Sequence, residues 1–164
     1  MADLTTNINY LQPTGFKIVM DRFHFPNLIF FATSVLHPNM SLAATPLPYR
    51  RVTAQMPGDK LTFGELTCNI IMDEEMNAYK EMYDWMESLV ETPNRKPGTK
   101  EYTQRPTSAD VSVIALTSHN NKTKEIKYVD ALPTSLGDVS FETVAGDQYI
   151  TFPVSFTFTY FKLV

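Results

Sequence analysis

The C-terminal stretch of the chain reads Ile150-Thr151-Phe152-Pro153-Val154-Ser155-Phe156-Thr157-Phe158-Thr159-Tyr160. Large apolar residues occupy every second position, and threonine, serine or proline stands between them. Successive side chains of a β-strand point to opposite faces of its sheet, so this pattern predicts a strand with one buried and one polar face. Because proline cannot donate a ladder hydrogen bond, we expect Pro153 at a sheet edge or a bulge.

Further upstream, five segments also carry strand patterns. They are residues 16–22, 28–37, 61–72, 110–118 and 123–131. The segment 28–37 has apolar residues on both faces, so a core or another subunit must cover both sides. The last two flank the turn-like Asn120-Asn121-Lys122, and residues 132–136 have the composition of a corner.

One helix interrupts the strands, at residues 74–91. Asp73 is a suitable N-cap, and Thr92-Pro93 ends the helical pattern. Apolar residues recur at helical spacing, and we expect this stripe to pack on the sheet. Its members are Met76, Tyr79, Tyr83 and Met86. About seven antiparallel strands and one helix predict a mainly β fold, an antiparallel sandwich or partly open barrel. The length of 164 residues fits a single domain, 1–164.

Residues 38–60 break the strand pattern, because four prolines and Pro57-Gly58 fall within them. We expect a long loop here, with a short strand only at 49–56. The loop carries the apolar residues Met40, Leu42, Leu47, Tyr49, Val52 and Met56 and the cations Arg50 and Arg51. Exposed apolar residues in such number mark an interaction site, so these residues are the candidate contact surface.

Composition excludes several classes of protein. Eighteen acidic and 14 basic residues give a net charge of −4, which argues against a surface built to bind phosphates. The single cysteine, Cys68, excludes an internal disulfide framework and fits a reducing compartment. No apolar run is long enough to span or anchor in a membrane, and no signal peptide is visible. The basic run 95–105 is interpreted as a solvated loop or protein contact rather than a DNA site.

Catalytic chemistry is not indicated by any motif. His24, His37 and His119 fall near turns or strand ends, without metal-ligand spacing and without Cys68 nearby in the sequence. Cys68 lies on the apolar side of its strand pattern, which predicts a buried, inert thiol. Asp73-Glu74-Glu75 is better explained by helix capping than by cation binding. We therefore expect no catalytic residue, no cofactor and no metal.

Several motifs follow one another along nearly the whole chain. They are Asp21-Arg22-Phe23-His24-Phe25-Pro26-Asn27-Leu28-Ile29-Phe30-Phe31, Pro46-Leu47-Pro48-Tyr49-Arg50-Arg51, Met56-Pro57-Gly58-Asp59-Lys60-Leu61-Thr62-Phe63-Gly64-Glu65-Leu66-Thr67, Met72-Asp73-Glu74-Glu75-Met76-Asn77, Trp85-Met86 and Leu132-Pro133-Thr134-Ser135-Leu136. In this order, together with the final aromatic and threonine strand, they resemble the tail tube protein family of contractile-tailed, T4-like bacteriophages.

The resemblance implies a structural virion protein of the tail, assembled in the host cytoplasm. Strands from six subunits would join into one barrel around a lumen, and the hexameric rings would stack into a tube. Its partners would be further copies of itself, the sheath protein and the baseplate tube initiators, with the tape-measure protein and DNA in the lumen. Six copies of a chain of net charge −4 also suggest an acidic lumen that does not hold DNA. The segment 38–60 would then be the contact between rings.

Two other interpretations remain open at this point. Baseplate tube initiators share the fold, as do tube proteins of type VI secretion and phage-like injection systems; initiators usually carry appended sequence, for which this chain has little room. From a different class, a monomeric binding module would use residues 38–60 as a recognition loop. Self-association distinguishes them, because only a tube subunit forms rings or filaments.

Overall fold

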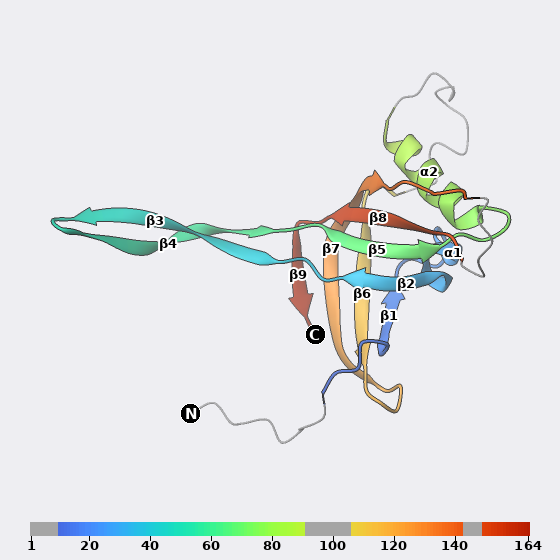
Figure 1. Ribbon diagram of the computed structural model, residues 1–164, viewed down its shortest axis with the longest axis horizontal. Coiled ribbons are helices and arrows are strands. Elements are labelled where there is room, and N and C mark those ends of the chain that lie inside the picture. Colours follow the sequence, from blue (N-terminus) through green and yellow to red (C-terminus); the bar gives the residue numbers. More distant parts are fainter. Residues whose placement is uncertain (1–9, 91–105, 143–148) are drawn as a thin grey trace.

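The computed structural model of the chain describes residues 10–90, 106–142 and 149–164. A seven-stranded antiparallel assembly forms its centre, in the order β1-β6-β7-β8-β5-β2, with β9 paired to β7 (Figure 1). The strands are β1 (Phe16–Val19), β2 (Ala32–Leu36), β5 (Leu66–Ile71), β6 (Ala109–Leu116), β7 (Lys122–Leu136), β8 (Thr151–Thr157) and β9 (Tyr160–Leu163). Two helices, α1 (Pro26–Phe30) and α2 (Asn77–Leu89), pack against it. We call these strands and helices the body.

Strand β7 belongs to two sheets at once. Its first half pairs with β6 and β9, and its second half, from Leu132 onward, pairs with β8. The change comes at Asp130, whose φ of 54° is left-handed, beside a register shift in the β6–β7 ladder. The β1–β6–β7–β9 sheet thereby turns away from the β7–β8–β5–β2 sheet. The predicted mainly antiparallel β fold is confirmed, but the sheets are not closed into a barrel within one chain.

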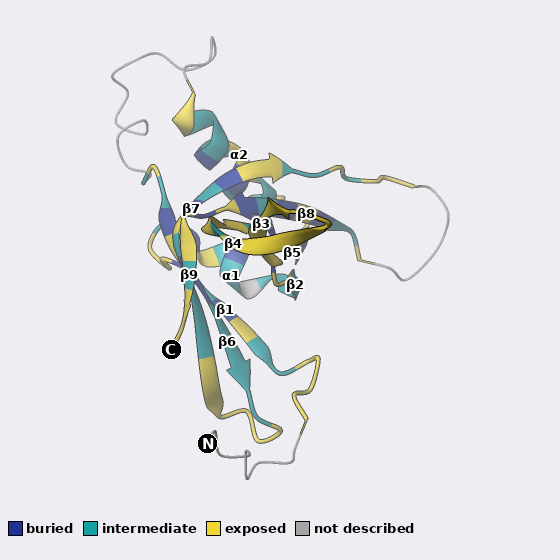
Figure 2. Ribbon diagram, turned by 90° about the vertical axis from the view of Figure 1, so that its left-hand side faces the viewer, coloured by how far each residue is buried: buried dark blue, intermediate teal, exposed yellow. Residues whose placement is uncertain are grey.

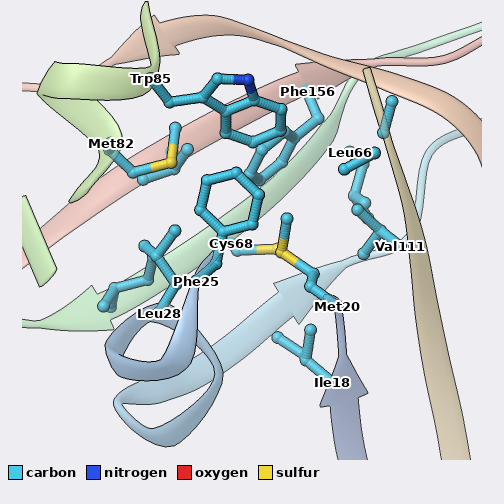
Figure 3. Close-up of a cluster of buried hydrophobic side chains, with 14 of the residues drawn as sticks. Ile18, Met20, Phe25, Leu28, Leu66, Cys68, Met82, Trp85, Val111 and Phe156 are labelled. Carbon is cyan, nitrogen blue, oxygen red and sulfur yellow. The ribbon is translucent and has the colours of Figure 1, made fainter. Parts of the chain in front are cut away.

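The hydrophobic core lies between the sheets and the helices (Figure 3). Every second residue of β5 and β8 points into it: Leu66, Cys68, Ile70, Phe152, Val154 and Phe156. From the other elements come Val111 and Tyr128 of the first sheet and Phe25, Met82 and Trp85 of the helical side, all fully buried. The period of two therefore identified the buried face correctly from Phe152 to Phe158, whereas Tyr160, at the start of β9, is exposed.

Helix α2 buries a different stripe from the predicted one. The fully buried residues are Ala78, Met82 and Trp85, whereas Tyr83 is 49% exposed. Tyr79 is half-buried and packs edge-on against Phe152, at 5.4 Å between ring centroids. The prediction was wrong for Met76 and Tyr83: Met76 precedes the helix, with a left-handed φ of 55°, and Tyr83 lies beside the buried stripe. Met86 is half-buried at the margin of that stripe.

The predicted limits of α2 were also too wide. It begins three residues later than expected, and Glu91 lies outside the described residues. Asp73 does act on the helix N-terminus, since its carboxylate accepts from the backbone amides of Asn77 at 3.0 Å and Ala78 at 3.2 Å. Its capping role was predicted correctly, although Met76 occupies the N-cap position.

A second helix, α1, replaces the first part of the predicted strand 28–37. Pro26 opens it, a position where the missing N–H costs nothing. The carboxylate of Glu81 on α2 accepts from the backbone N–H of Asn27 at 3.2 Å and of Leu28 at 3.3 Å. This carboxylate satisfies amides that would otherwise lack partners and favours a helix where the local pattern predicts a strand. Only Ala32–Leu36 remains as β2.

Strand β8 contains the proline that was expected at an edge or bulge. The strand is interior, between β7 and β5, so the edge prediction was wrong. Pro153 lies opposite Gly137, immediately after β7 ends, and the Gly137 amide donates to the Pro153 carbonyl at 2.8 Å. A Cβ on Gly137 would clash with the proline ring, so glycine gives the proline its space. The predicted long C-terminal strand is in fact two, β8 and β9, and the predicted corner 132–136 is the end of β7.

The segment 38–60 is not a loop. β3 (Met40–Tyr49) and β4 (Val52–Phe63) pair with each other as a separate two-stranded sheet that projects far from the body (Figure 1). The prolines do not interrupt the pairing, since Pro46 lies opposite Gln55 and Pro48 opposite Thr53. The predicted strand 61–72 accordingly divides: Leu61 belongs to β4, and β5 begins at Leu66. We call β3 and β4 the hairpin.

Candidate functional site

The hairpin is the most exposed ordered part of the molecule. Nearly every residue between Met40 and Thr62 is exposed, as the yellow strands in Figure 2 show. The six predicted apolar contact residues are between 49% and 71% exposed; they are Met40, Leu42, Leu47, Tyr49, Val52 and Met56. Leu61, which the sequence analysis missed, is similarly exposed and lies opposite Leu42. The structure therefore gathers all these side chains on one projecting element.

Strand register divides the outer half of the hairpin into two unlike faces. Residues directly opposite each other in an antiparallel pair share a face. One face combines Tyr49 with Val52, Leu47 with Ala54 and Thr45 with Met56. The opposite face combines Pro48 with Thr53, Pro46 with Gln55 and Ala44 with Pro57. We call the first one, which holds four of the predicted contact residues, the apolar hairpin face.

Prolines also make the two edges of the hairpin different. Pro46 and Pro48 stand at alternate positions of β3, so both ring nitrogens lie on the same edge. Because the β3–β4 ladder continues past them, that edge is the outer one, and it lacks two N–H donors. On β4, the corresponding outward positions include Thr53 and Gln55, which have their N–H groups.

The tip of the hairpin is a two-residue turn formed by Arg50 and Arg51. Tyr49 and Val52 close it as the last cross-strand pair. Arg50 has a φ of 49°, a left-handed conformation that costs a side-chain-bearing residue roughly 1 kcal/mol or more. Both arginines are exposed, so two positive charges stand at the outermost point of the hairpin.

Where the hairpin joins the body, aromatic side chains hold its base. Phe63 packs against Phe158 and Phe161, with ring centroids 5.7 and 5.4 Å away. His37, which precedes β3 at the base of the hairpin, hydrogen-bonds through Nδ1 to the hydroxyl of buried Tyr128 at 2.6 Å. Partial burial lowers the pKa of His37, which favours its neutral form. The base is thus anchored, while the outer part is free of the body.

The histidines, the cysteine and the acidic residues of the described ranges do not form a metal-binding cluster. Within residues 10–90, 106–142 and 149–164, no three His, Cys, Asp or Glu side chains are arranged to hold a metal ion. Cys68 is buried as predicted, and burial raises the pKa of its thiol to about 12, so the reactive thiolate is suppressed. His24 pairs with Asp21 at 2.5 Å in an exposed turn, and His119 hydrogen-bonds to Ser118 and Thr117 of its own turn.

A hollow of about 390 Å³ opens between the two sheets. Its wall is mostly apolar and includes Phe16, Val35, Val113 and Ile126. Among its polar side chains, His37 and Tyr128 bond to each other, and Thr33 and Ser34 bond to Asn69, so these groups do not converge on one empty position. Such a lining lacks the convergent polar groups of a substrate site.

Two further points concern the helices and the basic loop. Neither α1 nor α2, the helices in the described ranges, is long and apolar enough to cross a membrane. The predicted basic loop 95–105 lies outside the described residues. The candidate site therefore consists of the hairpin, with its apolar face and basic tip.

A protein-family model matches nearly the whole chain. The family model described as phage tail tube protein matches residues 4–164. Among curated proteins, no sequence matches the chain significantly.

Solved structures share the fold at low sequence identity. The chain is similar to one in the PVC sheath–tube complex, an extracellular contractile injection system in its extended state, with a TM-score of 0.70, 14% identity and 99% of each chain covered. It is similar to a chain of the anti-feeding prophage tube-terminating cap, with a TM-score of 0.69, 14% identity and coverage of 99% and 95%. A type six secretion system protein follows, with a TM-score of 0.52, 12% identity and coverage of 90% and 81%.

Proposed function

The chain belongs to the phage tail tube protein family, and we propose that it forms stacked hexameric rings as the inner tube of a contractile tail. The tube would be a conduit for DNA ejection within a contractile sheath. The family match over residues 4–164 supports a structural rather than an enzymatic role.

The observation that carries the proposal is the exposed apolar hairpin. An isolated two-stranded hairpin is marginally stable in water, and large exposed apolar surface is unusual in a monomer. Here the outer part of the hairpin buries almost nothing in its own chain. A second subunit that covers the apolar hairpin face would remove this surface from water and hold the hairpin in place.

The same hairpin is the proposed contact between rings. Its apolar side chains would supply most of the burial, and its tip would supply register. The contact residues are Met40, Leu42, Leu47, Tyr49, Arg50, Arg51, Val52 and Met56. Arginines at the tip would pair with acidic groups of the neighbouring ring, which favours correct register more than net affinity. Helix α2 would lie on the outside of the ring.

Other partners follow from the proposed tube. The sheath protein would surround it, baseplate tube initiators would begin it, and the tape-measure protein and DNA would occupy its lumen without sequence-specific binding. Assembly would take place in the host cytoplasm, and the finished protein would reside in the virion tail. No membrane anchor enters this scheme.

Electron microscopy of the purified chain tests the proposal. We expect the wild-type protein to form rings and tubes. A variant with Leu47, Tyr49, Val52 and Met56 changed to serine should give folded subunits or single rings but no long tubes. The matched control changes Thr53 and Gln55 to serine on the opposite face of the same hairpin, and it should still form tubes.

Each outcome has a distinct meaning. A wild-type chain that stayed monomeric at high concentration would contradict the tube proposal and favour a binding module. Normal tubes from the four-serine variant would remove the hairpin from the ring-to-ring contact and leave the ring itself in place. Circular dichroism of both variants would establish that the subunits remain folded.

A second candidate is a tube protein of an injection system. It is favoured by the likeness to the PVC and anti-feeding prophage chains, although at 14% identity this likeness concerns the fold alone. The sequence also leaves open a baseplate initiator. Co-purification of the native assemblies distinguishes these, because a phage tail would end at a DNA-filled capsid and an injection system would not.

A further inference from the structure

The β7–β8–β5–β2 sheet has one buried face and one open face. The open face is formed by the residues that alternate with the core residues of β5 and β8. Cross-strand pairs carry it across the sheet, Ser34 to Asn69 to Pro153 and Leu36 to Thr67 to Ser155 to Ser135. We call this surface, with Thr157, the uncharged face.

No charged residue occurs in β2, β5 or β8, nor in the Ala131–Leu136 part of β7. The polar groups of the uncharged face are hydroxyls and one amide, and they bond mainly to each other. The Asn69 amide donates to Ser34 Oγ at 2.9 Å, and Thr67 and Ser155 hydroxyls lie 3.4 Å apart. In a chain with 20% charged residues, four neighbouring strand segments without charge form a distinct surface.

The contrast with the other sheet is sharp. Its strands carry Lys17, Asp110, Lys122, Lys124, Glu125, Lys127 and Lys162. By comparison, the charged residues nearest in sequence to β5 and to the Ala131–Leu136 segment are Glu65, Asp73, Asp130 and Asp138, all of them acidic, whereas Lys162 follows β8. The four strand segments themselves therefore offer no lysine or arginine to a phosphate group.

Helices and core cover the opposite side of this sheet. Trp85 of α2 packs near Phe156, with ring centroids 6.1 Å apart, and Tyr79 packs on Phe152. Both phenylalanines belong to the buried face of β8. The uncharged face and α2 are thus on opposite sides of the same sheet, and if α2 lies outside a ring, the uncharged face is directed toward its centre.

We propose that the uncharged face lines the lumen of the tube and lets polyanions pass without retaining them; this rests on the proposed tube function. Retention of nucleic acid depends on lysine and arginine contacts to phosphates, which this surface lacks. Two cross-strand pairs, Asn69 with Ser34 and Thr67 with Ser155, also engage part of its polar groups with each other. The lumen wall itself is neutral, and acidic residues lie only at the ends of its strands.

Thiol labelling in assembled tubes tests the location. Asn69→Cys places a thiol at an exposed position of the uncharged face, and Lys80→Cys places one on the exposed side of α2. The wild-type chain, whose sole cysteine is buried, supplies the blank. We expect a small maleimide to label both variants in tubes, whereas a bulky polyethylene-glycol maleimide labels Lys80→Cys and loses access to Asn69→Cys. Unassembled subunits should react at both positions with both reagents.

The outcomes separate this inference from the tube proposal. Equal polymer labelling of both variants in tubes would overturn the inference alone, and so would failure of the small maleimide at Asn69→Cys, which would indicate a subunit interface. If the wild-type chain formed no tubes at all, the proposed function would be overturned, and the inference with it.

Added charge tests the passage of polyanions. Asn69→Lys and Thr157→Lys each place a cation on the uncharged face, and Tyr83→Lys places one on α2 as the control. Tubes of either lumen variant should retain a single-stranded oligonucleotide that nuclease cannot digest. Wild-type tubes should retain none, and any bound by Tyr83→Lys tubes should be digested. A nuclease-resistant oligonucleotide in wild-type tubes, or none in both lumen variants, would overturn the proposal.

Discussion

The body and the hairpin are both built from β-strands, but they differ in how far their side chains are buried. In the body, alternate residues of β5 and β8 are buried against helices and a second sheet, and the side chains hold one another in place. In the hairpin, the alternation persists, but both faces are exposed. Strand geometry is thus common to both, and only the body has a core. Under the proposed assembly, a second subunit would supply the packing partner that the hairpin lacks among the described residues.

This contrast predicts which substitutions will affect the stability of the subunit and which will affect assembly. A change in the body should alter the free energy of unfolding of the single subunit, whereas a change in the hairpin should alter assembly and leave the subunit stable. The following tests run from the largest expected effect on subunit stability to the smallest.

Trp85→Ala should be the most damaging change. Trp85 is fully buried, contacts Phe25 at 4.4 Å between ring centroids, and donates from Nε1 to the Pro106 carbonyl at 2.8 Å. Removal of a large buried aromatic side chain costs about 3–5 kcal/mol. Denaturant unfolding of unassembled subunits measures it, and a loss below about 1 kcal/mol would mean that α2 is not part of the core.

Cys68→Ser should have an intermediate effect. The thiol is 3% exposed on the inner face of β5, so a hydroxyl there would lack a ready partner and cost about 1–3 kcal/mol. Cys68→Ala is the control, because it removes volume without burying a polar group. Tube formation should be retained in both variants, and tubes lost from a folded Cys68→Ser subunit would contradict a purely packing role.

Asp73→Ala should cost about 1 kcal/mol at neutral pH, since it removes a cap from the N-terminus of α2. Desolvation raises the pKa of Asp73, but hydrogen bonds from the amides of Asn77 and Ala78 outweigh it and leave the pKa below its ordinary value. A lowered folded-state pKa means that this stabilisation is present above the unfolded-state pKa and is lost as the pH falls through the folded-state pKa. The gap between wild type and variant should therefore narrow in acid, and a gap independent of pH would contradict the ionic cap.

Tyr83→Ala and Tyr49→Ala should have the smallest effects on the subunit. Tyr83 is 49% and Tyr49 70% exposed, so each should change the free energy of unfolding by about 0.5 kcal/mol or less. In assembly the pair should differ, with tube yield reduced for Tyr49→Ala only. A cost of several kcal/mol for Tyr49→Ala in unassembled subunits would show that the hairpin packs on its own chain.

The sequence predicted the buried strands well, because their evidence is local. The alternation from Phe152 to Phe156 identifies a face regardless of what covers it, and the apolar side of β5, with Cys68, was recognised in the same way. Helix α2 was found for a similar reason, but its buried stripe was predicted one residue too far along the chain, for example at Tyr83 instead of Met82. Several adjacent positions are apolar, and only the partners, Phe25 and Phe156 beside Trp85, determine which of them faces inward.

Other features depend on residues distant in sequence and could not be predicted from local pattern. α1 is stabilised by Glu81, which lies 54 residues from Asn27. The hairpin was mistaken for a loop because its prolines were interpreted as strand breakers. They stand at alternate positions on an outer edge, where a missing donor costs no ladder bond. The candidate contact residues, which apolar composition marked in the sequence, are exposed as a group, and their role as a contact stays a prediction.

Pro46 and Pro48 have a consequence for the life of the unassembled subunit. A long, exposed, apolar strand edge is a template for indiscriminate cross-strand pairing and hence for aggregation. On β3, the two prolines remove N–H donors that such a template needs. This edge is therefore poorly suited to the repeated strand addition that builds amyloid-like fibrils. In the unassembled subunit the apolar side chains of the hairpin are exposed, but the β3 edge beside them is a poor template for further strands. Side-chain docking, rather than backbone pairing along β3, is left as the route to growth.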